Sequence, residues 1–234
     1  MAHVWRKPEV DERLIKLLVG LIAIFLPVLV CWLSWPEALG SISAAYWVPE
    51  WPRTIFIGFL FAIGGFLLAY DGRTTAERIA AKIAAVAALL IALYPCQCTT
   101  HEEIVKGVHY AAAMTMYLVL AFFCWKFRKR ALDKPWAQAR ARAWMYTVCG
   151  FALVLAILAL AANFAMHNAL AEQHVWFVFS WETVGLVAFG FSWLTASHSL
   201  PFFNTHAERF RPFALRYTPP VDGTVTLTED MDGR

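Results

Sequence analysis

The sequence predicts an all-α protein: a six-transmembrane-helix bundle with both chain ends in the cytoplasm and a short cytoplasmic interfacial segment. Of the 234 residues, 60% are hydrophobic and only 16% are charged, which is too apolar for an ordinary soluble domain. The apolar residues form blocks close to the length that crosses about 30 Å of hydrocarbon. The expected spans are residues 17–35, 54–70, 79–94, 107–125, 143–166 and 175–197.

The first and third blocks need separate justification. Basic residues precede block 17–35 and the small residues SISAA follow it, so a cleaved secretory signal is the alternative. Its uncharged stretch is longer than a usual signal core, which favours a retained anchor. Block 79–94 is rich in Ala and interrupted by Lys82, but this side chain lies one turn from the end and can reach the interface. We count both blocks as spans.

The distribution of Lys and Arg predicts the orientation. With six spans, 18 of the 20 basic residues fall on one face, and only Arg53 and Lys106 fall on the other. Both termini are therefore expected in the cytoplasm. The net charge of +3 does not indicate a nucleic-acid partner, because the basic residues flank spans and accompany no recognition motif.

The chain divides into three parts on these patterns. Residues 1–200 form the transmembrane domain. Residues 201–216 mix Phe with Arg, as expected of a juxtamembrane segment that touches anionic lipid. Residues 217–234 have no apolar periodicity and end in acidic residues, which is typical of a mobile tail.

Glu182 is the one acidic residue inside block 175–197. Ionising a carboxyl group in hydrocarbon costs roughly 2.5 to 3.5 kcal/mol on insertion scales, so the side chain should face inward. At about 1.5 Å per residue, its backbone lies roughly 10 Å below the outer boundary. His109 lies near the outer end of block 107–125, which enters the membrane from the same side. We therefore expect the Glu182 side chain to lie within reach of His109, Arg53 or water. The alternative is a structural hydrogen bond or an ion pair with Arg53, with His109 as a packing residue.

Other polar residues converge on the outer side and extend this candidate site. A binding site would use Glu182, His109, Ser43, Tyr46, Arg53 and Tyr110. A lipid hydrolase or transferase would use Glu182 or His109 as general base, with Ser41 or Ser43 nearby as further catalytic candidates. Tyr110, Met114 and Tyr117 share one helix face, which is compatible with lining a ligand although helix packing is favoured.

The cysteines give only a weak metal signal. Cys31, Cys124 and Cys149 lie in apolar blocks and are expected to pack. The outer sequence C-x-C-x-x-H resembles a soft-metal ligand set, but no second cluster completes a tetrahedral site. A disulfide or free thiols are therefore favoured, and no cofactor is identified. The weak metal candidates are Cys96, Cys98, His101 and His174.

The glycines suggest where helices approach each other. Gly58, Gly64 and Gly65 lie in the second block, and Gly185 and Gly190 lie in the last. We expect close helix contacts at both groups, although neither has G-x-x-x-G spacing.

Several segments together resemble a bacterial membrane family. They are SISAAYW, RTIFIGFLFAIGGFLLAYDG, ALYPC, HYAAAM followed by FFCWKF, and ETVGLVAFGFSWL. In this set the chain resembles the domain-of-unknown-function 998 family, which is similar to DRAM and Frag membrane proteins. The resemblance implies a six-helix bundle in a bacterial cytoplasmic membrane and supplies no activity. It draws attention to Ser41, Ser43, Tyr46, Asp71, Gly72, Pro95, His109 and Glu182.

Three hypotheses follow from the sequence. The first is an outward-facing polar pocket that binds or transports a lipid head group or a small polar solute. The second is a membrane-embedded lipid hydrolase or transferase, with or without a metal. The third is an accessory subunit of a membrane assembly, in which the chain could form an oligomer. Membrane lipid is an expected partner in all three.

Overall fold

A computed structural model describes residues 11–97, 101, 104–205 and 208–210. This part of the chain is all α and contains no strand, which confirms the predicted fold class. A short helix that was not expected, α6, precedes the last long one, and two 3₁₀ helices, η1 and η2, lie in loops. The long helices are α1 (Glu12–Leu33), α2 (Trp51–Ala69), α3 (Thr75–Leu93), α4 (Val108–Leu132), α5 (Ala137–Ala165) and α7 (Phe177–Ala196). The short ones are η1 (Ser43–Tyr46), α6 (Ala169–Gln173) and η2 (Pro201–Phe203).

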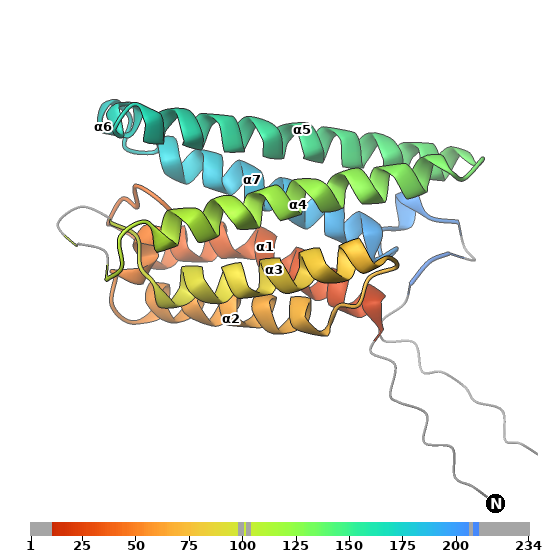
Figure 1. The fold of residues 1–234 in the computed structure, drawn as a ribbon, viewed down its shortest axis with the longest axis horizontal. Coiled ribbons are helices and arrows are strands. Elements are labelled where there is room, and N and C mark those ends of the chain that lie inside the picture. Colours follow the sequence, from red (N-terminus) through yellow and green to blue (C-terminus); the bar gives the residue numbers. More distant parts are fainter. Residues whose placement is uncertain (1–10, 98–100, 102–103, 206–207, 211–234) are drawn as a thin grey trace, which may run out of the picture.

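The six long helices form one closed bundle (Figure 1). Each packs against the next along the chain, with α5 followed by α7, and α7 packs against α1 to close the ring. The beginning of α1 and the end of α7 lie at the same end of the bundle, and α6 lies at the opposite end (Figure 1). We call the end with α6 the α6 end and the other the terminal end.

Five of the helices are long and apolar enough to cross a membrane: α1, α2, α4, α5 and α7. This indicates a multi-pass membrane protein. Large apolar side chains such as Phe25, Trp32 and Phe151 are exposed on the bundle, as the lipid-facing surface of such a protein requires. Helix α3 carries Glu77, Arg78 and Lys82 and is not among the five. The structure therefore supports five of the six expected spans.

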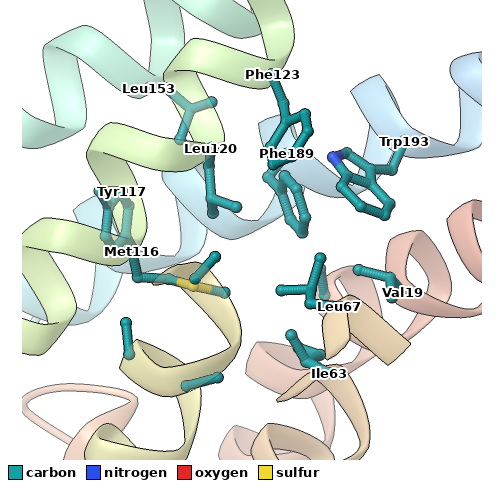
Figure 2. Packing of buried hydrophobic residues seen from close by; sticks show 14 of the residues in the cluster. Val19, Ile63, Leu67, Met116, Tyr117, Leu120, Phe123, Leu153, Phe189 and Trp193 are labelled. Atoms are coloured by element: carbon teal, nitrogen blue, oxygen red, sulfur yellow. The ribbon is translucent and has the colours of Figure 1, made fainter. Parts of the chain in front are cut away.

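Large apolar side chains from several helices pack together in the core of the bundle (Figure 2). The fully buried ring of Trp193 lies 5.2 Å from that of Phe189 and 5.5 Å from those of Phe123 and Tyr70. These rings come from α7, α4 and the residue that follows α2. Because such rings bury large apolar areas, this cluster fixes how the three elements pack.

Glycine allows α1 and α7 to pack closely against each other. A Cβ added at Gly190 would lie 2.5 Å from Cγ1 of Ile24 and 2.7 Å from the carbonyl oxygen of Gly20. A Cβ at Gly185 would lie 2.1 Å from the ring of Tyr117. The expected close contacts of Gly185 and Gly190 are thus confirmed.

The expectation for the second block holds at one glycine only. A Cβ at Gly64 would meet Leu89 at 3.2 Å, whereas nothing lies within 4 Å of one at Gly58 or Gly65. The prediction of close contact at those two positions was wrong, because they face away from the neighbouring helices.

The residues after α7 fold back onto the terminal end. Arg142 is buried and donates to the Phe203 carbonyl at 2.6 Å, to Oδ1 of Asn204 at 2.9 Å and to Glu208 at 3.0 Å. His198 donates through Nδ1 to the same Asn204 oxygen at 2.6 Å. The predicted segment 201–216 is described only in part, and the tail 217–234 lies outside the described residues.

Charged groups at this end shift two pKa values. Burial, together with the nearby charge of Arg142, lowers the pKa of His198 to about 4. Burial raises the pKa of Glu208, but hydrogen bonds from Lys134 and Arg142 outweigh it and lower this pKa to about 2. His198 is therefore neutral and Glu208 is ionised near neutral pH.

Candidate ligand-binding site

A cavity of about 800 Å³ lies at the α6 end, between α4, α5, α7 and the loop that contains η1. Its walls are mainly apolar and include many small side chains, which leave the space that aromatic rings fill in the terminal half. The walls are formed by Gly40, Ala44, Ala111, Ala113, Met114, Tyr117, Ile157, Leu160, Ala161, Phe164, Ala171, Val175 and Val178. The polar lining residues are Ser41, Ser43, Cys96, Gln97, His109, Tyr110, Asn163, Asn168, Glu172 and Glu182, and Gly107 completes the lining.

Ser43 and His109 form a hydrogen-bonded pair at the cavity wall. Oγ of Ser43 lies 3.0 Å from Nε2 of His109, and both residues are buried. Nδ1 of the same ring lies 2.8 Å from the carbonyl oxygen of Tyr94. Because a carbonyl only accepts, Nδ1 carries the proton, and in a neutral ring Nε2 then accepts from the Ser43 hydroxyl. The end of α3 therefore fixes the tautomer of a histidine on α4.

Glu182 lies in the second turn of α7 and faces the cavity, as predicted. Its Oε2 accepts from the Ile42 backbone N–H at 2.5 Å, and its carboxyl group also accepts from the Ser43 backbone N–H. The carboxyl group thus holds the start of η1 against α7. Contact with His109 runs through Ser43, so three residues from three elements form one polar cluster.

Backbone hydrogen bonds hold the loop that carries Ser43. Oγ of Ser41 accepts from the Ala44 N–H at 3.0 Å, which forms the turn into η1. The Phe179 N–H donates to the Gly40 carbonyl at 3.1 Å and ties the loop to the start of α7. The hydroxyl of Tyr117 donates to the Glu182 carbonyl at 2.9 Å. Hydrogen bonds therefore hold this loop in a defined turn and tie it to α7.

Two predicted ligand-binding residues lie elsewhere. Nε of Arg53 donates to the Tyr46 carbonyl at 2.5 Å, and its guanidinium lies 5.6 Å from the centre of the Tyr46 ring. Neither residue lines the cavity, and within the described residues Arg53 makes no ion pair with Glu182. The alternative of an Arg53–Glu182 ion pair is wrong, because Arg53 at the start of α2 turns toward η1.

The weak metal candidates do not assemble within the described residues, where no group of three His, Cys, Asp or Glu side chains is placed to hold an ion. Cys96 is disulfide-bonded, and Cys98 lies outside the described residues. The His101 ring stacks on Trp47 at 4.1 Å. His174 follows α6 and is exposed. The apolar-block cysteines, Cys31, Cys124 and Cys149, are free thiols.

Sequence reasoning missed Asn163, which is buried in α5 and lines the cavity. Its amide donates to Oδ1 of Asn168 at 3.0 Å and accepts from the Ala171 N–H at 3.0 Å, so it shapes the turn into α6. The available signal was its position as the one amide side chain in an apolar run. Tyr110, Met114 and Tyr117 all line the cavity, and Tyr110 also donates to the Gln97 carbonyl at 3.3 Å.

No protein-family model, curated protein or solved structure matches the chain. The resemblance to the 998 family therefore stays a prediction. The chemistry of the site follows from its own geometry: a mainly apolar cavity with one wall cluster that can both donate and accept hydrogen bonds.

Proposed function

We propose that the chain is a six-span protein of the bacterial cytoplasmic membrane that binds a single-chain amphiphile in the cavity at its outer, α6 end. The head group would contact Ser43, His109 and Glu182, and the apolar chain would lie between α4, α5 and α7. The orientation is supported by charge: Lys16 lies near the start of α1, at the terminal end, while Arg53 lies at the start of α2 and Lys106 just before α4, at the α6 end.

The observation that carries this proposal is the composition of the cavity wall. A volume of about 800 Å³ is in the range of small-molecule sites. Most of its wall consists of Ala, Leu, Ile, Val, Met and aromatic side chains, which gain nothing from a wholly polar solute. A molecule with one polar end and one apolar body fits both parts of the wall. This favours an amphiphile over a small polar solute.

A cavity-filling substitution tests the proposal. Ala161 lines the cavity, while the adjacent Ala162 is exposed on the outer surface of α5. Ala161→Phe should weaken binding of a fluorescent fatty acid to the purified protein by about tenfold or more, since a loss of about 1.4 kcal/mol is tenfold in affinity. Ala162→Phe should bind like the wild type. Equal affinities for the two variants, or no binding to the wild type, would refute the proposal.

A second function, ester hydrolysis or acyl transfer, is favoured by one observation: the Ser43 hydroxyl points to His109, whose other nitrogen is held by a carbonyl. Ser43 Oγ would attack an ester carbonyl while Nε2 takes its proton and then passes it to the leaving alcohol. Water would cleave the acyl-serine in the same way. Binding remains better supported, because Glu182 already occupies the backbone N–H groups of Ile42 and Ser43.

A serine-reactive probe distinguishes the two functions. Hydrolysis predicts that a fluorophosphonate labels the wild type and that Ser43→Ala and His109→Gln abolish labelling. If fatty-acid binding is normal and labelling is absent, the binding function stands and the hydrolytic one is excluded.

A further inference from the structure

A second, smaller cavity lies at the terminal end of the bundle, far from the site described above. Its volume is about 50 Å³, several times the roughly 10–15 Å³ that holds one water molecule. A small anion fits such a space, and an acyl chain does not. The cavity is lined by Lys16, Arg73, Arg130, Lys134, Arg142 and His198, with Phe127, Ala131, Tyr146 and Ala196.

The basic side chains that line this cavity come from separate elements of the fold. Lys16 comes from the first turns of α1, Arg73 from the loop before α3, and Arg130 from the end of α4. Lys134 lies between α4 and α5, and Arg142 lies in α5. Like charges repel, so five of them stay together in the fold only when acidic groups offset them.

Three carboxylates among the described residues pair with four of these five cations. Glu12 lies 3.2 Å from Lys16, and Glu77 lies 3.1 Å from Arg130. Glu208 serves both Lys134 at 2.8 Å and Arg142 at 3.0 Å. Glu77 is also shared with Lys126 at 4.0 Å. The cations around the cavity therefore outnumber their paired carboxylates.

Two of the cations that line the cavity are buried. Lys16 is 7% exposed and Arg142 is 2% exposed, so neither can be fully hydrated. Taking a charge out of water is unfavourable unless a partner compensates. The Lys16 ammonium has one carboxylate and the face of the Tyr70 ring, 5.0 Å from its centre, and it lines the cavity. An anion in the cavity would reach cations from both sides of the bundle.

We propose that this cavity binds a phosphate group, carried either by an anionic lipid of the cytoplasmic leaflet or by a soluble phosphate compound. Two features favour phosphate. Three of the five cations are arginines, whose planar guanidinium matches phosphate oxygens in a bidentate fashion. The volume admits one tetrahedral anion. Bound phosphate would join α1, α4, α5 and the loop before α3, and so stabilise the terminal end.

Arg73 provides the test and Arg140 its control. Arg73 is exposed and lines the cavity, whereas Arg140 is an exposed arginine of the same end that does not line it. The thermal unfolding of the full chain is measured in phosphatidylcholine nanodiscs, with and without phosphatidylglycerol, and separately with inorganic phosphate at matched ionic strength. We expect stabilisation of the wild type and an apparent affinity weakened about tenfold in Arg73→Gln, with Arg140→Gln unchanged.

The measurements with phosphatidylglycerol and with inorganic phosphate identify the source of the phosphate. A response to phosphatidylglycerol alone assigns the lipid head group, and a response to inorganic phosphate assigns a soluble ligand. No response of the wild type to either, or equal responses of the two variants, would overturn the proposal. If Arg73→Gln does not fold, Lys134→Gln replaces it in the same comparison. Fatty-acid binding at the α6 end is independent of this result.

Discussion

The contact between α1 and α7 gives a stability prediction that can be worked from the structure. Gly190→Ala places a methyl group 2.5 Å from Ile24 Cγ1 and 2.7 Å from the Gly20 carbonyl oxygen, both far inside van der Waals contact. The side chain could move, but the backbone oxygen moves only with its helix. Overpacking of this kind costs about 1–3 kcal/mol. For a chain of this length that corresponds to roughly 2–12 °C in the midpoint of thermal unfolding.

Gly65→Ala is the matched control. It makes the same chemical change in an apolar helix, but nothing lies within 4 Å of the new methyl group. Alanine is the better helix former by about 1 kcal/mol, so this variant should be as stable as the wild type or more so. Both are compared by fluorescence-detected thermal unfolding in the same detergent. The packing argument is refuted if Gly190→Ala is as stable as Gly65→Ala.

Three further predictions concern the site and the terminal end. Glu182→Ala should destabilise the protein by about 1–3 kcal/mol, because buried loop N–H groups lose their acceptor. Glu182→Gln keeps an acceptor oxygen and should lose less stability. Chemical denaturation in mixed micelles compares the two variants. Gly185→Ala displaces the Tyr117 ring, whose Cε1 would lie 2.1 Å from the new Cβ, and fluorescent fatty-acid titration should show weaker binding. The pKa of His198 is about 4 in the folded chain against 6.5 unfolded, so the unfolded chain binds more protons between these values. Stability should fall as the pH decreases from 6.5 to 4, and protonation of Glu208 should add a further loss from pH 4.5 toward 2. The midpoint of thermal unfolding of His198→Gln should therefore change less between pH 6.5 and 4 than that of the wild type.

The sequence predicted the helices well because each is an apolar block bounded by charged or loop residues. All six expected ranges overlap a long helix, and α6 is the one α-helix among the described residues that was missed, since five residues give too little periodicity. At the site, the inward orientation of Glu182 followed from the cost of exposing a carboxylate to lipid. Its partners did not follow, because the path of the loop from Gly40 to Tyr46 determines which N–H groups it meets.

The sequence by itself determined an all-α membrane-type chain, the helix positions and the need for Glu182 to face inward. These are consequences of hydrophobicity and charge along the chain, which any packing of the helices must satisfy. Only the tertiary structure decided that Ser43 joins Glu182 to His109, that Arg53 turns to Tyr46, and that small residues on α4 and α5 leave a cavity. Such contacts depend on distances between residues far apart in sequence, and hydrophobic patterns do not encode those distances.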